Sequence, residues 1–361
     1  MLLQRIGLRN FRNIEEINLE FEPGPTFLLG LNGQGKSNLL EAIGFITAMR
    51  AFRTSDQRSL IRHGNDEAAM AYEMEHERSG ATQLTVRLRP NGRSVEVDGV
   101  PVRRLGDVIG QFPTVVFASE DIQLIRGGPA LRRRLIDLFL SSLDPEYFTC
   151  LMRYHRSLRD RNALLKQEAG DGQLDAFEQV MAPLAYRILQ SRSALMTALD
   201  ASLCAFYTGL TGGSEKPGFQ YRPDVSADGA KNWLEVYRSG RLRDRQLRST
   251  QKGPHRDDFR LLLEDRDAQE FASEGQQRGL VLALRFAQLE TIRKRSGVAP
   301  IVLADDVLGE LDSERRERFW CHLELDTQII ASGTKIPESG RKGAWRVFHT
   351  EEGRFRPEPS Q

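Results

Sequence analysis

Eight consecutive residues near the start of the chain have the types and spacing of a phosphate-binding loop. The stretch follows the pattern G-x-x-x-x-G-K-[ST], after an apolar run and before an amphipathic one. Its glycines allow backbone N–H groups to turn toward phosphate oxygens at the positive end of the next helix. Lys36 is expected to reach the β- and γ-phosphates of ATP, and the Ser37 hydroxyl to hold Mg²⁺. The predicted nucleotide-binding residues are Gly30, Leu31, Asn32, Gly33, Gln34, Gly35, Lys36 and Ser37.

A pair of adjacent carboxylates supplies the chemistry that a phosphate-binding loop lacks. Residues 300–304 are apolar and predict a buried strand, and Asp305 and Asp306 come at its end. Asp305 is expected to anchor the Mg²⁺ shell, and Asp306 to polarise the attacking water. With Lys36, these two residues are the predicted catalytic groups for ATP hydrolysis.

A third motif precedes this strand by some thirty residues. Ser273 and Gly275 lie at the predicted N-terminus of a helix that begins near Glu274, where N–H groups can bind an anion. A simple N-cap by Ser273 is the alternative interpretation of the same residues.

The elements that must position these motifs alternate between strands and helices. Short apolar runs in residues 1–30 predict strands, Pro90-Asn91-Gly92 predicts a hairpin, and TVVFAS predicts a buried strand. Two amphipathic helices are predicted at about residues 147–166 and 174–205, and they are expected to pair antiparallel. The pair predicts either a projecting arm or a shorter packed subdomain, and the sequence leaves both open.

This order predicts an α/β fold in which two distant segments complete one ATP-binding core around a helical insertion. The predicted divisions are 1–128 for the first part of the core, 129–250 for the insertion and 251–361 for the second part.

Composition limits the classes of protein to consider. With 51 Lys and Arg against 50 Asp and Glu, the net charge of +1 selects no class of partner, so any nucleic-acid surface must be local. The three cysteines lack metal-site spacing, and no apolar run approaches the ~20 residues of a membrane span. We therefore expect a folded cytoplasmic protein without a membrane segment.

The succession of these motifs resembles the ABC-type ATPase head shared by transporters, SMC proteins and the RecF family. Three stretches narrow the resemblance to the RecF family. They are residues 8–13 (LRNFRN), residues 117–134 with FASED, GGP and RRR, and residues 253–259 (GPHRDDF). The resemblance extends from about residue 2 to residue 335.

The resemblance implies that ATP lies between two protomers of an ATP-dependent homodimer. Ser273, Gly275 and Gln276 would then meet the γ-phosphate bound at Lys36 of the partner protomer. Arg12 would contact the α-phosphate or the ribose. Asp312 would lie in the segment that crosses the interface, Thr334 falls in the γ-phosphate sensor region, and Gln111 and Ser119 are both candidates for the Q-loop position.

Two departures from related sequences bear on catalysis and on the interface. Asp306 stands where fast ABC enzymes have a glutamate, which is one methylene longer, and slow hydrolysis is therefore expected. Gly309 stands where related sequences often have serine, which bears on the geometry of the contact between protomers.

Arginine clusters predict a local nucleic-acid surface. Such clusters neutralise phosphates and give salt-dependent, sequence-tolerant binding. The candidate DNA contacts are Arg132, Arg133, Arg134, Arg153, Arg156, Arg243 and Arg245. The resemblance implies binding to double-stranded and gapped DNA, and action beside RecR and RecO to help RecA assemble. Rival interpretations are the nucleotide-binding subunit of a transporter and a P-loop kinase of small molecules, whereas an SMC-like coiled coil is excluded because the helical insertion is short.

Overall fold

The computed structural model describes residues 1–54, 56–213, 215–324, 326–337 and 345–358. The chain forms two compact units. Unit 1 comprises Met1–Asp121, Phe206–Gly212 and Leu282–Gln361, and unit 2 comprises Ile122–Ala205 and Gly213–Val281. The boundaries therefore fall after Asp121 and Val281, rather than after residues 128 and 250, because the chain around Gly253 and the strand that follows it pair inside unit 2.

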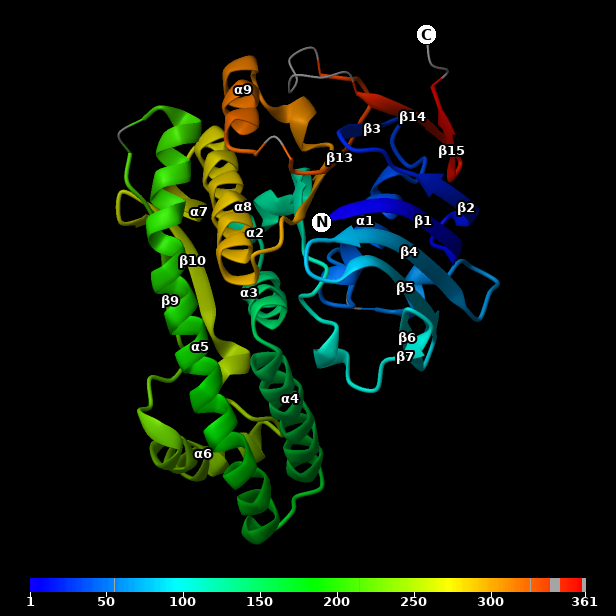
Figure 1. Cartoon of the computed structure of the whole chain (residues 1–361). Helices are drawn as coiled ribbons and strands as arrows, with labels where there is room; N and C mark the ends of the chain where they lie inside the picture. Colours follow the sequence, from blue (N-terminus) through cyan, green and yellow to red (C-terminus); the bar gives the residue numbers. More distant parts are fainter. Residues whose placement is uncertain (55, 214, 325, 338–344, 359–361) are drawn as a thin grey trace. The chain divides into compact units, whose positions relative to one another are not determined.

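Unit 1 contains a largely parallel sheet that carries the glycine-rich loop and the Asp305–Asp306 pair. Its strand order is β15-β14-β3-β13-β12-β8, and only the β14–β15 pair is antiparallel (Figure 1). Segments from both ends of the chain thus complete one sheet, as predicted. Helix α1 (Lys36–Gly44) packs against its strands β8, β12 and β13. The strands are β3 (Pro25–Leu29), β8 (Thr114–Ala118), β12 (Ile301–Asp305), β13 (Ile329–Gly333), β14 (Arg346–Glu351) and β15 (Arg354–Pro357).

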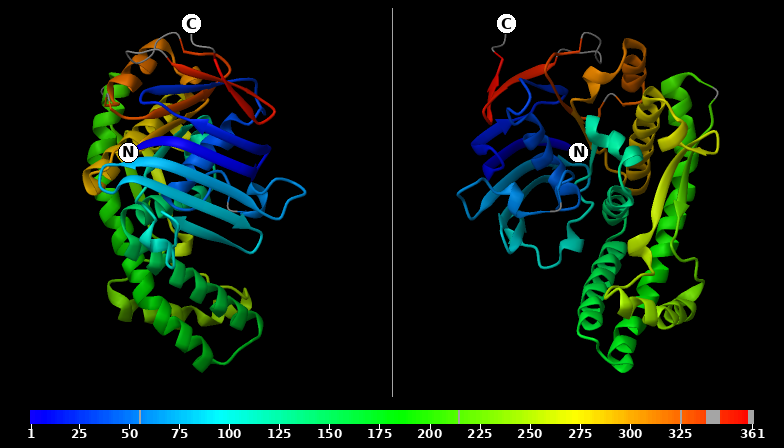
Figure 2. Two further views of the ribbon diagram at one scale, coloured as in Figure 1. Left: turned by 45° about the vertical axis from the view of Figure 1, so that its right-hand side comes forward. Right: turned by 180° about the vertical axis from the view of Figure 1, so that it is seen from behind.

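A second sheet of unit 1 is antiparallel, in the order β2-β1-β4-β5-β6-β7 (Figure 2). The hairpin predicted at Pro90 is confirmed, since Arg89 pairs with Gly92 across the turn. Buried and exposed residues alternate along β5, as expected of a sheet with one buried face. The strands are β1 (Leu2–Phe11), β2 (Ile14–Glu20), β4 (Ala68–His76), β5 (Gly80–Arg89), β6 (Gly92–Val97) and β7 (Val100–Pro101).

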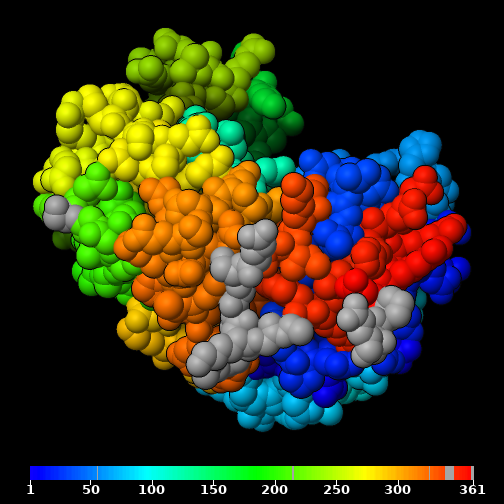
Figure 3. Space-filling model, turned by 90° about the horizontal axis from the view of Figure 1, so that it is seen from above, coloured from blue at the N-terminus to red at the C-terminus, as the bar shows by residue number. Residues whose placement is uncertain are grey.

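The two ends of the described chain meet within unit 1. In Figure 3 the C-terminal strands, in red, lie beside N-terminal residues, in blue. This matches the pairing of β14 with β3 and the contact of β15 with β2. Helix α9 (Ser313–Cys321) adds Phe319 to an aromatic cluster with Phe117 and Phe286, whose ring centroids are 4.9–5.2 Å apart.

Unit 2 combines helices with a small sheet. Residue contacts run in opposite directions along α4 and α5, from Tyr147 beside Arg192 to Arg161 beside Glu178, which confirms the predicted antiparallel pair. A third helix, α6, packs against α4, and the sheet β11-β10-β9 contacts α5 through Phe219 and Phe259, so that unit 2 is a packed subdomain rather than two bare helices. Its elements are α2 (Gln123–Arg126), α3 (Pro129–Leu143), α4 (Pro145–Lys166), α6 (Gly229–Gln246), α7 (Ala268–Phe271), β9 (Pro217–Arg222), β10 (Asp258–Leu263) and β11 (Arg266–Asp267). Helices α5 (Asp171–Thr211) and α8 (Glu274–Ser296) continue from unit 2 into unit 1.

Buried ion pairs tie the helices of unit 2 together. The guanidinium of Arg161 on α4 donates to Glu178 on α5 at 2.8 Å and to Asp244 on α6 at 2.7 Å. Arg192 on α5 likewise pairs with Asp137 on α3 at 2.8 Å and with Asp257 at 2.6 Å. Asp257 belongs to the GPHRDDF stretch, so this stretch anchors α5 through a buried charge pair.

His255 of the same stretch makes the stability of unit 2 depend on pH. Its ring nitrogens hydrogen-bond the Tyr154 hydroxyl at 2.8 Å and the Thr250 carbonyl at 3.1 Å, and burial lowers its pKa to about 4. The unfolded chain takes up a proton near pH 6.5, whereas the folded chain resists protonation until about pH 4. Stability is therefore highest above pH 6.5 and falls by about 3 kcal/mol as the pH drops through this window. Urea denaturation of wild type and His255→Gln at pH 7.5 and 4.5 should show a smaller loss in the variant, and an equal loss would contradict this role.

None of the described helices is both long enough and apolar enough to cross a membrane.

Candidate nucleotide-binding site

The predicted phosphate-binding loop lies between β3 and α1, and its backbone requires glycine at two positions. Gly35, the N-cap of α1, has φ 113°, a conformation that other residues adopt only with strain. A Cβ on Gly30 would lie 2.4 Å from the carbonyl oxygen of Thr350 on β14. The turn between β14 and β15 also supports the loop, since the Gly353 N–H donates to the Gln34 carbonyl at 2.7 Å.

Lys36 is held inside the loop by the loop itself. Its Nζ donates to the carbonyl oxygens of Gly30 at 2.8 Å and Leu31 at 2.9 Å, and the residue is only 3% exposed. A buried ammonium whose acceptors are two neutral carbonyls, with no carboxylate partner among the described residues, is well placed to bind an anion. The loop thus presents a positive charge at the N-terminus of α1.

The structure brings Ser37 and Asp305 together across 268 residues of sequence. Ser37 Oγ donates to Asp305 Oδ1 at 2.8 Å, and Ser332 Oγ on β13 donates to the same oxygen at 2.8 Å. Burial raises the pKa of Asp305, while the hydrogen bonds from Ser37 and Ser332 oppose this rise. The pairing follows from the topology, because β12 is one strand from β13 and two strands from β3 in the parallel sheet.

Asp306 follows β12 in a left-handed conformation with φ 56°. Such a conformation costs a non-glycine residue on the order of 1 kcal/mol, although aspartate tolerates it better than most. The Asp306 N–H donates to Ser332 Oγ at 3.1 Å, which fixes the turn. Ser332 therefore orients both acidic residues.

These side chains line one pocket of about 270 Å³. It includes residues that the sequence analysis did not select, namely Asn38, Arg53 and Glu120, and Arg53 pairs with Glu120 at 3.1 Å. Of the two candidate Q-loop residues, Ser119 lines this pocket, whereas the Gln111 side chain donates to the Asp107 carbonyl. The remaining lining residues are Asn32, Gly33, Gly35, Lys36, Ser37, Ala118, Ser119, Asp305 and Asp306.

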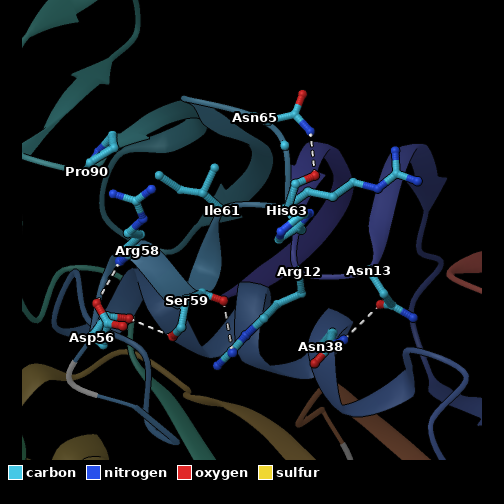
Figure 4. Close-up of a pocket in the computed structure, with 12 residues that line it drawn as sticks. Arg12, Asn13, Asn38, Asp56, Arg58, Ser59, Ile61, His63, Asn65 and Pro90 are labelled. Atoms are coloured by element: carbon cyan, nitrogen blue, oxygen red, sulfur yellow. Dashed lines mark hydrogen bonds between the residues drawn. The ribbon is translucent and has the colours of Figure 1, made fainter.

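Arg12 lies in a second, larger pocket of about 1130 Å³, which shares Asn38 with the first (Figure 4). Its guanidinium pairs with the buried Glu41 of α1 at 2.9 Å and donates to the Ser59 carbonyl at 3.0 Å. Burial raises the pKa of Glu41, and the Arg12 charge opposes that rise. Asn13 also faces this pocket and accepts a 2.8 Å hydrogen bond from Asn38. Polar groups therefore continue from the phosphate-binding loop toward the 56–65 segment.

The third predicted motif lies in unit 2, at the N-terminus of α8. The Ser273 N–H donates to Gln276 Oε1 at 2.7 Å, and the Gln276 N–H donates to Ser273 Oγ at 3.3 Å. This reciprocal pair is a capping box, as the simpler interpretation expected. The Ser273 hydroxyl proton has no acceptor among the residues that the structure describes, and Gly275 follows it on the first turn. Gln276 also donates from its side chain to Glu215.

Two further residues from the sequence analysis, Asp312 and Thr334, do not line the pocket. Asp312 is the N-cap of α9, where its carboxylate accepts the Arg315 N–H at 2.8 Å. Thr334 is exposed directly after β13.

Burial divides the predicted DNA-contact residues into two groups. Arg132 is 4% exposed and pairs with Asp258 at 2.7 Å, so the structure contradicts its assignment as a DNA contact. Arg133 donates to the Asp257 carbonyl at 2.7 Å and is half-buried, and Arg134 is also half-buried. Arg245 is exposed but pairs with Asp171 at 2.7 Å.

The remaining candidates are exposed cations. Arg153 and Arg156 lie on α4 and Arg243 lies on α6, and the described part of the chain gives none of them an ion pair. Arg159 on α4 shares these properties. Other arginines of α6 are neutralised by acids distant in the sequence, since Arg238, Arg241 and Arg245 pair with Asp171, Asp175 and Glu178.

Comparison with known proteins identifies the family to which this architecture belongs. A family model described as the RecF/RecN/SMC N terminal domain matches residues 2–338. The chain is 34% identical over 379 residues to the DNA replication and repair protein RecF of Synechococcus sp. (strain JA-3-3Ab), with 100% of this chain and 99% of that protein covered. It is 32% identical to the RecF protein of Lactobacillus johnsonii over 93% of each chain.

Comparison with solved structures gives the same family. The structure of the recombination mediator protein RecF-ATP in the RecFOR pathway matches with a TM-score of 0.90 at 29% identity, over 99% of this chain and 98% of that one. An SMC head bound to the winged-helix domain of ScpA matches with a TM-score of 0.53 at 16% identity, a likeness in fold alone. The expected ABC-type head and the resemblance drawn from the sequence are both confirmed, and the chain belongs to the RecF family of DNA replication and repair proteins.

Proposed function

We propose that this chain is an ABC-type ATPase that closes on duplex DNA as an ATP-dependent homodimer and is reset by slow hydrolysis. The observation that carries the proposal is the single pocket that contains Lys36, Ser37, Asp305 and Asp306. These are the groups that phosphoryl transfer to water requires in P-loop enzymes. Full-length similarity to a RecF protein bound to ATP supports the same nucleotide.

The oxygen donors in this pocket fit Mg²⁺. Magnesium is usually bound by one or two protein oxygens together with substrate phosphates. Ser37 Oγ and Asp305 Oδ1 supply two such oxygens 2.8 Å apart, and the described residues contain no cluster of three or more His, Cys, Asp or Glu that would suit another metal. When bound, the ion would neutralise charge on the phosphates.

The roles of the protein groups follow from their positions. Lys36 exchanges the carbonyls of Gly30 and Leu31 for phosphate oxygens, while the N–H groups at the start of α1 bind the same phosphates. Asp306, held by Ser332, orients the attacking water. Because Asp306 is shorter than glutamate, hydrolysis is slow and times the opening of the dimer.

The second pocket is the proposed site of the nucleoside half of ATP. It adjoins the phosphate pocket at Asn38, and Arg12 lies within it. The Glu41 carboxylate holds the Arg12 guanidinium in one position. The cation is therefore already oriented before the nucleotide binds.

The DNA surface is proposed on the exposed cations of unit 2, Arg153, Arg156 and Arg159 on α4 and Arg243 on α6. Because these cations have no acidic partner in the described chain, they are free to neutralise phosphates. Binding is expected to be sequence-tolerant, to include gapped DNA, and to weaken steeply with salt. Action beside RecR and RecO, to help RecA assemble, is proposed from the RecFOR pathway named for the similar structure.

The rival functions have less support. A transporter subunit or a small-molecule kinase would share the phosphate-binding loop, but the similarity to RecF proteins extends over the whole chain, unit 2 included.

Ser273→Arg tests the proposal. The larger, positively charged side chain should block the approach of the partner's phosphate site. Because Ser273 does not line the protomer's own pocket, ATP binding should remain while ATP-dependent dimerisation is lost. Molecular mass is measured with and without ATP and Mg²⁺, and then with duplex DNA at two salt concentrations. Ser239→Arg, at an exposed serine of α6, is the matched control. Normal dimerisation of Ser273→Arg would rule out the shared site, and a wild type that stays monomeric with ATP would rule out the homodimer.

A further inference from the structure

Two large apolar side chains are exposed beside the two halves of the proposed split site. Leu31, in the phosphate-binding loop, is 73% exposed, and Phe271, two residues before Ser273, is 53% exposed. Single exposed apolar residues are ordinary on protein surfaces, so exposure alone identifies no interface. The positions of these two residues carry more information, because each adjoins a group proposed to contact the same phosphate.

The backbone of Leu31 and the ring of Phe271 are each held by a neighbouring cation, while the apolar surface of both side chains stays in solvent. The carbonyl of Leu31 accepts the hydrogen bond from Lys36 Nζ at 2.9 Å, which fixes the loop at this residue. Phe271 ends α7, and the guanidinium of Arg266 lies over its ring, 3.6 Å from the centroid. This cation–π contact favours one orientation of the ring. Exposed aromatic side chains, phenylalanine among them, are enriched in protein interfaces.

The proposed dimer confines the two residues to one region. In that dimer, Lys36 of one protomer and Ser273 of the other contact the same γ-phosphate. The Leu31 carbonyl accepts a direct hydrogen bond from Lys36, and the Cα of Phe271 lies within about 7 Å of the Ser273 Cα because only Ala272 separates them. Leu31 and Phe271 of the facing protomers are therefore both immediate neighbours of that phosphate.

We propose that Leu31 of one protomer packs against Phe271 of its partner when two copies of the chain close over ATP. This contact rests on the proposed function. It occurs twice in a two-fold symmetric dimer, and each copy buries apolar surface at the edge of a nucleotide site. The contact adds affinity between protomers that the nucleotide alone does not supply, and it excludes water from the edge of the phosphate site.

Cysteine cross-linking tests the contact directly. One protomer carries Leu31→Cys and a second, differently tagged protomer carries Phe271→Cys, both with Cys204→Ser and Cys321→Ser to remove the accessible native thiols. Oxidation of the mixture should give a mixed-tag cross-link with ATP and Mg²⁺ and none without nucleotide. Leu242→Cys, at an α6 leucine that is 74% exposed, replaces Leu31→Cys in the matched control. ATP-dependent dimerisation without a cross-link above this control would overturn the contact.

A double-mutant cycle gives the second measurement. The dimer dissociation constant at saturating ATP is compared for wild type, Leu31→Ala, Phe271→Ala and the double variant. Each single change should raise the dimer dissociation constant roughly tenfold or more. The double variant should lose less binding free energy than the two single variants together, because the residues share one contact. Binding of a fluorescent ATP analogue to monomeric Phe271→Ala should match wild type. Additive effects would refute the contact, whereas a wild type that never dimerises with ATP would instead refute the proposed function.

Discussion

An Asp305→Asn variant is expected to bind ATP but to turn it over roughly 100-fold more slowly than wild type, or slower. Asp305 Oδ1 accepts hydrogen bonds from Ser37 and Ser332 at 2.8 Å each, and the amide oxygen of asparagine can accept both. The substitution therefore preserves the local structure and removes only the negative charge. Without that charge the proposed Mg²⁺ site loses its one carboxylate.

Two measurements separate this loss from misfolding. Phosphate release gives the turnover number, and titration of Mg²⁺ against a fluorescent ATP analogue should show that the variant needs more Mg²⁺ for the same occupancy. Asp160→Asn, at an exposed position of α4, makes the same chemical change away from the pocket and should behave as wild type. Turnover of Asp305→Asn within threefold of wild type would remove Asp305 from the proposed mechanism.

The second large effect is expected on stability. Arg161→Met should destabilise unit 2 by about 3–5 kcal/mol, because it removes one member of a fully buried ionic cluster. The side chains of Arg161 and Glu178 are 0% exposed and that of Asp244 is 3% exposed. Methionine keeps much of the apolar stem, but it leaves both carboxylates with one partner fewer. Glu178 still receives hydrogen bonds from Arg241, so the larger penalty falls on Asp244.

Arg238→Met is the matched control for this stability measurement. It breaks a pair with Asp175 in which the two side chains are 45% and 27% exposed, and such surface pairs contribute about 0–1 kcal/mol. Urea denaturation followed by circular dichroism gives the free energy of unfolding, and hydrogen exchange in α4 and α5 assigns the loss to unit 2. A loss below 1 kcal/mol for Arg161→Met would mean that the buried cluster relaxes or takes up water.

Much of unit 1 could be predicted from the sequence because its signals are local. The apolar runs at β12 and β13 are strands buried along their whole length, and β3 is buried at its three central residues. The glycine-lysine-serine loop lies between β3 and helix α1. The antiparallel helices of unit 2 were also predictable, from their amphipathic spacing. Each of these features is specified by residues that are neighbours along the chain or along one helical face.

The basic clusters show where sequence reasoning fails. Arg132 and Arg133 are adjacent in the sequence but differ in their surroundings. Arg132 is buried and forms an ion pair with Asp258, whereas Arg133 is half-buried and donates to the Asp257 carbonyl. A run of arginines indicates the local charge but not which side chains are buried. Burial depends on which acidic residues the fold brings into contact with them from other parts of the chain. The domain boundary near residue 250 failed for a similar reason, because the pairing of β10 with β9 assigns the following segment to unit 2.

The residue types of the proposed site could be identified from the sequence: a glycine-rich loop ending in lysine and serine, two carboxylates at the end of an apolar strand, and a serine at a helix N-terminus. Their geometry depends on tertiary contacts. The tertiary structure brings Ser37 into hydrogen-bonding contact with Asp305, and Ser332 into contact with both acidic residues. It also pairs Arg12 with the buried Glu41, and it pairs some of the exposed arginines with acidic residues while leaving others without an ion pair in the described chain. The difference lies in the sequence separation of the interacting residues. Backbone conformation and helix capping follow from nearby residues, whereas ion pairing and burial depend on contacts between residues that are distant in sequence.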